Sequence, residues 1–186
     1  MSSHLTFPVG QGGAFLATRG KARSLRESLE KRLTADPACG SVEIDFSAVE
    51  AMTISFADEL LGRFFSALAV GDVRPVAVLL TGLNEETTEA VTICLERRDL
   101  AAVTSAGNRK QLVGAQDFLA DSYQRALELR RFKAGEFATS LGITPQNANN
   151  RLKRLVAAGA VQKERITPAG RGGKEFSYAL PSWAVQ

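Results

Sequence analysis

The stretch FATSLGITPQNANNRLKRLVAAGAV, from Phe137 to Val161, decides how the C-terminal part of the chain is interpreted. Thr144 is a good helix N-cap, because its hydroxyl can accept a free backbone N–H of the first turn. Pro145 would fall at the first helical position, where its missing N–H costs nothing. Gly142 can take the positive φ that ends a preceding helix. The stretch therefore predicts a helix-turn-helix whose second helix begins after Thr144.

The predicted second helix is amphipathic. One apolar stripe at helical spacing contains Ala148, Leu152, Leu155 and Val156. The other face and the helix start supply the candidate DNA contacts, which are Thr144, Gln146, Asn147, Asn150, Arg151, Lys153 and Arg154. Asn and Gln can pair with adenine edges, Arg with guanine or phosphate, and Lys with phosphate. Such a helix suits a major groove, although many helices with basic outer faces simply contact water.

Two strands joined by a basic loop are expected after this helix. Residues 160–165 (AVQKER) fit a strand, and residues 175–180 (EFSYAL) alternate apolar and polar side chains as a second strand does. The glycine-rich loop between them offers Arg171 and Lys174 to a phosphate backbone or a minor groove. The order helix, helix, strand, basic tip, strand predicts a winged helix.

The segment from about Leu119 to Pro181 resembles the winged helix-turn-helix domains of bacterial transcription regulators. The matching residues are Glu136-Phe137-Ala138, Leu141-Gly142-Ile143-Thr144, Arg151-Leu152-Lys153-Arg154-Leu155 and Ala158-Gly159. The resemblance implies a small α+β domain that binds double-stranded DNA. Some winged helices bind only proteins, so that alternative stays open.

Charge is distributed unevenly along the chain. Residues 1–116 carry 12 basic and 14 acidic side chains, whereas residues 117–186 carry 11 basic and 6 acidic ones. Basic charge is thus concentrated where DNA binding is expected. The chain has a single histidine, His4, which is too few for a histidine metal site and makes a Ser-His-Asp triad improbable. Cys39 and Cys94 lack metal-ligand spacing. We therefore expect no enzyme, no metal and no cofactor.

The first part of the chain alternates strand and helix patterns, which predicts a mostly parallel sheet with packed helices. The run PVAVLL at residues 75–80 is continuously apolar, as in a strand covered on both faces. Other expected elements are short strands within residues 4–16, helices at residues 21–33, 55–69 and 84–98, and strands at residues 41–46 and 100–104. The fold class is thus an α/β domain followed by a small α+β domain.

The residues from about Ala14 to Thr104 resemble the STAS-like domains of bacterial proteins, which are relatives of the anti-anti-sigma factors. The motifs are Ala17-Thr18-Arg19 with Ala22, Ile44-Asp45-Phe46-Ser47 with Val49, and TISFADELL at residues 53–61. In anti-anti-sigma factors a partner kinase of the histidine-kinase-like ATPase class phosphorylates a serine at the start of this helix. The resemblance places Ser55 at that position, with Thr53 and Asp58 beside it. The chain departs from the Asp-Ser-Ser-Gly pattern, since it has Thr53-Ile54-Ser55-Phe56.

Two interpretations of Ser55 stay open. Ser55 followed three positions later by Asp58 resembles a capping box with Asp in place of Glu, and capping alone would explain a serine there. The alternative is recognition by a partner, with or without phosphorylation. Asp45, Asp58 and Glu59 are interpreted as solvated or capping carboxylates rather than as a metal site or an acid–base set.

The sequence thus predicts three segments, with a STAS-like domain at residues 1–104, a linker at residues 105–116 and a winged helix-turn-helix domain at residues 117–186. A short strand at residues 111–113 stays open within the linker. The favoured hypothesis is a cytoplasmic transcription regulator, with DNA as one partner and a protein or signal as the other. The alternative is an adaptor that engages a histidine-kinase-like ATPase without sequence-specific DNA binding. A homodimer stays open, and no apolar run approaches the ~20 residues of a membrane span.

Overall fold

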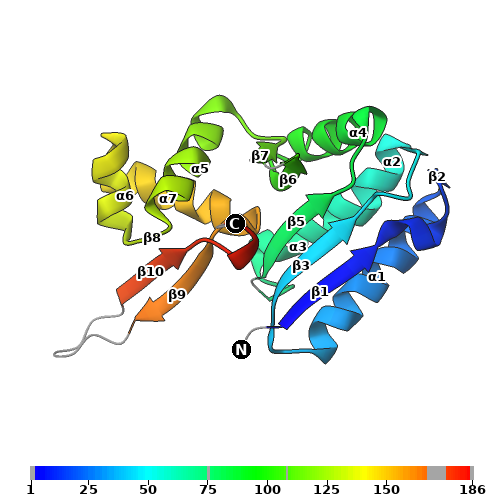
Figure 1. Ribbon diagram of the computed structural model, residues 1–186, viewed down its shortest axis with the longest axis horizontal. Coiled ribbons are helices and arrows are strands. Elements are labelled where there is room, and N and C mark those ends of the chain that lie inside the picture. Colours follow the sequence, from blue (N-terminus) through cyan, green and yellow to red (C-terminus); the bar gives the residue numbers. More distant parts are fainter. Residues whose placement is uncertain (1–2, 75, 108, 167–174, 185–186) are drawn as a thin grey trace.

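The computed structural model describes residues 3–74, 76–107, 109–166 and 175–184. A five-stranded sheet contains, in spatial order, β1 (Ser3–Pro8), β3 (Cys39–Asp45), β5 (Ala77–Thr81), β6 (Ala102–Ala106) and β7 (Arg109–Val113) (Figure 1). The first four strands are parallel and β7 is antiparallel to β6. The predicted, mostly parallel sheet is therefore confirmed.

Helices connect the parallel strands. They are α1 (Arg19–Ala35), α2 (Ile54–Ala57), the π-turn η2 (Asp58–Gly62), α3 (Arg63–Val70) and α4 (Glu85–Glu96). Adjacent strands follow each other in chain order, and right-handed crossovers in one direction place all connecting helices on one face of a sheet. On this face Ile44 lies beside Leu80 in register, and both belong to a core with apolar residues of α1 and α3.

Three short elements lie at the carboxyl end of the sheet. The 3-10 turn η1 (Val9–Gly12) follows β1, and β2 (Phe15–Leu16) pairs in parallel with β4 (Ala51–Met52). A hydrogen bond from the backbone N–H of Thr53 to the Leu16 carbonyl then fixes the start of α2 beside β2. This pairing positions the segment around Ser55, which the sequence had marked as a candidate site.

The C-terminal part contains three helices and a three-stranded antiparallel sheet. The helices are α5 (Asp117–Leu129), α6 (Ala134–Leu141) and α7 (Pro145–Ala157). The strands β8 (Arg131–Phe132), β9 (Gln162–Ile166) and β10 (Glu175–Ala179) lie in the order β8-β10-β9. The 3-10 turn η3 (Ser182–Ala184) follows. Helices α6 and α7 and strands β9 and β10 follow each other in the order expected from the sequence, and the basic tip between the two strands lies outside the described residues.

The C-terminal elements pack on the face of the sheet that the connecting helices leave bare. Leu79 and Val103, from β5 and β6, share a core with residues of all three C-terminal helices, among them Leu119, Tyr123, Phe137, Leu152 and Leu155. Figure 1 shows α5 and the end of α7 on the β5–β6–β7 side of the sheet, with α6 beyond them. Strand β5 is thus covered on both faces, as its continuous apolar run predicted.

Two hydrogen bonds to the backbone tie the C-terminal part to the sheet. The Val78 N–H donates to the Gly159 carbonyl at 3.0 Å, and the Gln162 side-chain amide donates to the Gly40 carbonyl at 2.9 Å. The segment at residues 105–116, expected to be a linker, contains the end of β6 and the whole of β7. The two parts of the chain therefore meet through a shared apolar core rather than across an open linker.

Candidate nucleic-acid interface and partner surface

Helix α7 begins as its sequence predicts. The Thr144 hydroxyl accepts a hydrogen bond from the Asn147 N–H at 3.3 Å, and Pro145 occupies the first helical position. Gly142 ends α6 in the left-handed conformation, with φ +63°. The turn between α6 and α7 is thus only a few residues long, and it fixes the direction in which α7 leaves the core.

Helix α7 is amphipathic as predicted, except that Val156 of its predicted apolar stripe is only half-buried. Ala148, Leu152 and Leu155 are fully buried in the core that the helices share with β5 and β6. The exposed residues of the predicted contact set are Thr144, Gln146, Asn147, Asn150 and Lys153. Exposed amide side chains thus occupy the first two turns of α7, and Lys153 follows them as an exposed basic side chain.

Arg151 is held by the protein itself. Its Nε donates to the Asn147 side-chain oxygen at 3.1 Å. Its Nη1 donates to the Phe118 carbonyl at 3.3 Å and to the Ser122 hydroxyl at 3.1 Å. The guanidinium also lies over the Phe118 ring, 5.1 Å from the centroid. These contacts link α7 to α5 and orient the side chain of Asn147.

Arg154 forms an ion pair with the first part of the chain. Its Nη2 lies 2.5 Å from Oδ1 of Asp99, a residue that follows α4 and has φ +53°. The Arg154 guanidinium also lies 5.5 Å from the centroid of the Phe118 ring. The positive charge of Arg154 is therefore neutralised locally in this arrangement.

The C-terminal end of α3 lies against α7. Between the two helices is a cavity of about 530 Å³, lined by residues 68–70 of α3, by Gly71 after it and, from α7, by Asn149, Asn150, Lys153, Val156 and Ala157. Lys163 and Tyr178 from the small sheet complete its wall. The first turn of α7 lies outside this cavity, whereas the later turns face α3 across it.

The predicted wing contacts Arg171 and Lys174 lie outside the described residues. Strands β9 and β10 lead toward that loop, and Glu175 pairs with Ile166 at the last described register position. On the same two strands, the Lys163 ammonium lies 4.0 Å from the centroid of the Phe176 ring, as in a cation–π contact. Lys163 is thus a described basic side chain on the strand that leads to the predicted wing.

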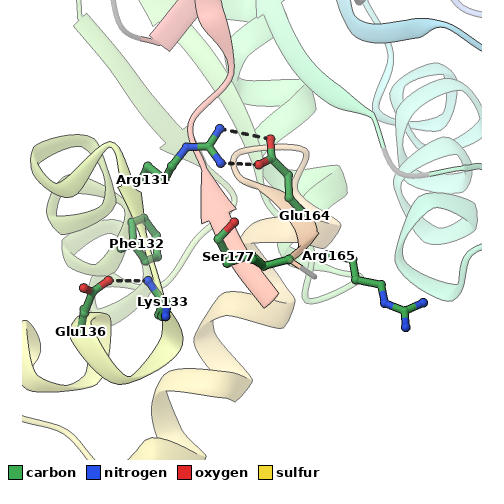
Figure 2. A pocket seen from close by; sticks show the side chains of 8 residues that line it. Arg131, Phe132, Lys133, Glu136, Glu164, Arg165 and Ser177 are labelled. Atoms are coloured by element: carbon green, nitrogen blue, oxygen red, sulfur yellow. Dashed lines mark hydrogen bonds and ion pairs between the residues drawn. The ribbon is translucent and has the colours of Figure 1, made fainter. Parts of the chain in front are cut away.

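A charged pocket of about 490 Å³ lies where β8 ends (Figure 2). Arg131 pairs with Glu164 at 2.5 Å, and the Lys133 N–H donates to the Glu136 carboxylate at 2.6 Å. The Ser177 hydroxyl is buried without a hydrogen-bond partner among the described residues, and Figure 2 shows it on the side of the Arg131–Glu164 pair.

Of the two interpretations left open for Ser55, the capping box with Asp58 is wrong. Thr53 is the N-cap of α2, because its backbone is extended and its hydroxyl accepts the Phe56 N–H at 3.2 Å. The same hydroxyl donates to the Ala17 carbonyl at 3.2 Å. Ser55 therefore lies inside the first helical turn, where its side chain is exposed. Asp58 takes no part in capping, since Arg98 holds its carboxylate.

Asp58 and Arg98 form a two-pronged ion pair. Arg98 Nε lies 2.6 Å from Oδ1 of Asp58 and Nη2 lies 3.1 Å from Oδ2. The hydrogen bond from Arg98 outweighs the effect of burial and lowers the pKa of Asp58 below its usual range. A Cβ at Gly62 would lie 2.7 Å from Arg98 Nε, so glycine leaves the room that this ion pair needs.

Glu59, interpreted from the sequence as a solvated or capping carboxylate, is instead buried at the centre of an arginine cluster. Its side chain is 2% exposed. The nearest nitrogen atoms belong to Arg63 at 2.9 Å, Arg23 at 3.4 Å, Arg26 at 3.5 Å and Arg19 at 3.9 Å. Burial raises the pKa of Glu59, but the bonds and charges of Arg23 and Arg63 lower it overall.

The spacing of charged residues in the sequence indicates this cluster, although the apolar helix pattern alone does not. Arg19, Arg23 and Arg26 recur at intervals of four and three residues, which places them on one face of α1. Arg63 follows Glu59 by four residues, the spacing of a helical ion pair. No pattern within one helix shows that these two faces meet, because their contact depends on how α1 packs on the π-turn.

An exposed aromatic residue lies beside the start of α2. Phe15 in β2 is 70% exposed and pairs in register with Ala51. The hydrogen bond from Thr53 to Ala17 places this strand next to the first turn of α2. Aromatic side chains are enriched at protein interfaces. We define the partner surface as Phe15, Thr53 and Ser55.

Comparison with known protein families found a match within the first part of the chain. Residues 21–69 match the family described as a STAS-like domain of unknown function (DUF4325). The match covers most of α1 to α3 and includes β3, the start of α2 and Glu59 with Arg23, Arg26 and Arg63. Arg19 and Arg98 lie outside the matched residues. A STAS-like domain in residues 21–69 points to a regulatory or protein-interaction role. No curated protein and no solved structure matched the chain.

The helices were also compared with the length and hydropathy that a membrane span requires. Within the described ranges, none is both long and apolar enough to cross a bilayer.

Proposed function

We propose that the chain is a transcription regulator that binds double-stranded DNA through a winged helix formed by residues 117–186. Helix α7 would lie in the major groove, and residues 1–104 would form a STAS-like domain that receives a signal from a partner. The observation that carries this proposal is α7 itself. A threonine cap and a buried apolar face hold the helix, while its first turns present Gln146, Asn147 and Asn150 to solvent.

The contacts divide into two classes under this proposal. Asn150 and Gln146 are one helical turn apart and would contact base edges, as amide side chains do at adenine. Thr144, at the helix start, and Lys153 would contact phosphate. Arg151 and Arg154 would mainly hold α7 in place, since the protein already supplies their partners. Arg171 and Lys174 remain the proposed wing contacts.

The first test is the substitution Asn150→Ala. Losing an amide that pairs with a base should weaken binding to the preferred sequence by roughly 1–3 kcal/mol and relax the preference at one position. The preferred sequence would first be selected from random DNA with the purified protein. Asn149→Ala is the matched control, because Asn149 is exposed on the same helix but points about 100° away.

Two results would count against the DNA proposal. One is the absence of any enriched sequence in the selection. The other is an Asn150→Ala variant that keeps both affinity and sequence preference in a fluorescence titration. Binding should also weaken as salt is raised, because phosphate contacts release counterions.

A second function belongs to a different class, an adaptor that engages a histidine-kinase-like ATPase through the STAS-like domain. The partner surface favours it, since Phe15 is an exposed aromatic residue and Ser55 is an exposed hydroxyl in the first turn of α2. A phosphate on Ser55 would add negative charge there. Under both proposals the chain is not an enzyme, needs no cofactor and acts in the cytoplasm.

The Ser55 variants test this second function directly. Ser55→Asp adds a charge and Ser55→Asn does not, and neither removes the helix cap, which is Thr53. If Ser55→Asp changes partner capture or reporter output while Ser55→Asn does not, charge at this position controls the contact. Wild-type behaviour of both variants would exclude Ser55 as a switch.

A further inference from the structure

The arginine cluster around Glu59 contains more positive charge than its carboxylates need. Five guanidiniums take part, from Arg19, Arg23, Arg26, Arg63 and Arg98. The carboxylates among them are those of Asp58, Glu59 and Glu30. The cluster therefore has an excess of two positive charges. One well-placed arginine is enough to pair with one buried carboxylate, and like charges at these distances repel each other.

Three of these arginines remain open to solvent. The side chains of Arg19, Arg23 and Arg63 are 57%, 59% and 54% exposed, whereas Arg26 is 17% exposed. Arg23 and Arg63 each bond Glu59 through Nε alone. Among the described residues, no acceptor hydrogen-bonds their Nη groups. The carboxylate thus holds these guanidiniums by one edge and leaves their remaining donors free.

The backbone beneath the cluster is also unusual. Asp58 to Gly62 form a π-turn inside what would otherwise be one continuous helix from α2 to α3. Such π-bulges are rare and frequently mark functional sites. Arg63 follows at the first residue of α3, and α1 lies against this turn. The irregular turn therefore lies where the two arginine-bearing helices meet.

We propose that Arg19, Arg23 and Arg63 form a binding site for the phosphoryl group of a small phosphorylated molecule. A phosphoryl group has three strong acceptor oxygens and nearly two negative charges at neutral pH. It can take a hydrogen bond from each guanidinium and neutralise the excess charge of the cluster. The three arginines surround a single carboxylate, so they suit a compact anion better than an extended one. This site would give the regulatory part of the chain a small-molecule signal, which goes beyond the proposed DNA binding.

The test is titration of the full chain with inorganic phosphate and with pyrophosphate by calorimetry. The double substitution Arg23→Gln with Arg63→Gln removes two guanidiniums and leaves Arg26 and Arg19 with Glu59. Each lost charge-assisted bond should weaken binding by about tenfold or more. Lys31→Gln is the control, since it removes one positive charge from an exposed position on the same helix α1.

A second measurement separates ligand binding from a purely structural role. Phosphate should raise the melting temperature of the wild-type chain and of Lys31→Gln, because a ligand that binds only the folded state stabilises it. It should not raise that of the double variant. Arg63→Lys keeps the charge but loses the planar fork, so it should bind with intermediate affinity.

The proposal is overturned if wild-type protein binds neither probe, or if the double variant binds both as wild type does. Its failure is distinguishable from failure of the proposed DNA binding. The double variant keeps α7 unchanged, so its affinity for the selected DNA sequence, measured without phosphate, reports on the DNA proposal alone.

Discussion

At the scale of single residues, Glu59 shows how burial changes the role of a carboxylate. A carboxylate that is 2% exposed requires compensation by neighbouring charges and hydrogen bonds. Removing one member of a buried ion pair is strongly destabilising, because the charges that remain lose their partner. Glu59 therefore holds α1 and α3 together across the π-turn through its ion pairs with arginines of both helices.

The first prediction concerns Glu59→Gln and its pH dependence. At neutral pH the substitution should lower the free energy of unfolding by roughly 3–5 kcal/mol, measured in urea. The pKa of Glu59 is lowered in the folded state, so its ionised form stabilises the protein above the unfolded-state pKa of about 4.3. That stabilisation is lost as the pH falls through the folded-state pKa.

The difference between wild type and Glu59→Gln should therefore shrink in acid. Glu30→Gln is the control, because Glu30 pairs with Arg26 nearer the surface and its loss should cost no more than about 1 kcal/mol. Equal losses for the two variants at neutral pH would show that Glu59 is not the organising carboxylate of the cluster.

Single residues also show where sequence reasoning ends. The sequence placed Arg151 and Arg154 on a helix that could face DNA, and both are on that helix. It could not show that Ser122 and Asp99 would be within hydrogen-bond distance of their guanidiniums. Helical periodicity describes one element at a time, whereas partner choice depends on how two elements pack.

At the scale of elements, the start of α2 distinguishes two hydroxyl residues only two positions apart. Thr53 has the extended backbone and the hydrogen bond of an N-cap, and Ser55 is the second residue of the helix, inside its first turn. The helix start was predicted to within two residues. The cap was misplaced because both hydroxyls precede apolar helix positions, and only the backbone conformation decides between them.

The second prediction is that Thr53→Ala costs more stability than Ser55→Ala. Loss of an N-cap typically costs about 1 kcal/mol, within a range of 0.5–2. An exposed serine inside the helix should cost no more than about 0.5 kcal/mol when replaced by alanine. Urea unfolding of the two variants compares them directly. A larger loss of stability for Ser55→Ala than for Thr53→Ala would show that Ser55 caps the helix.

At the scale of the whole molecule, the helices that connect the parallel strands cover only one face of the sheet. The other face must be covered by other elements. The strands run in the order β1-β3-β5-β6 with crossovers in one direction, so one face receives all the connecting helices. The run at residues 75–80 predicted that β5 is covered on both faces, but not by which element. The C-terminal helices supply that cover, which the expectation of a separate domain after a linker did not foresee.

The third prediction uses two glycines with nearly the same backbone conformation. Gly142 has φ +63° and Gly159 has φ +65°. A Cβ at Gly142 would meet nothing within 4 Å, whereas one at Gly159 would lie 2.7 Å from the backbone nitrogen of Val78. Gly142→Ala should therefore cost only the left-handed strain of about 1–2 kcal/mol.

Gly159→Ala should cost that strain plus about 1–3 kcal/mol for the clash with β5. Thermal unfolding of both variants measures the difference, which reports how tightly α7 is attached to the sheet. Equal losses would show that the contact between Gly159 and Val78 contributes nothing beyond local backbone strain.

The last prediction concerns the ion pair that joins the two parts of the chain, and it rests on the proposed DNA binding. Asp99→Asn keeps a residue type that tolerates positive φ and frees the Arg154 guanidinium. Asp99 is 73% exposed on its side chain, so the loss of stability should stay below about 1 kcal/mol. A freed Arg154 should reach phosphate, which raises DNA affinity and steepens the slope of log affinity against log salt by about one.

Glu96→Gln is the matched control for Asp99→Asn, because it removes one negative charge from an exposed position on the neighbouring helix α4. It changes net charge equally but leaves Arg154 paired, so the salt slope should stay at its wild-type value. If both variants steepen the slope alike, net charge alone sets the affinity. If neither does, Asp99 does not restrain Arg154, and α7 contacts DNA without that guanidinium.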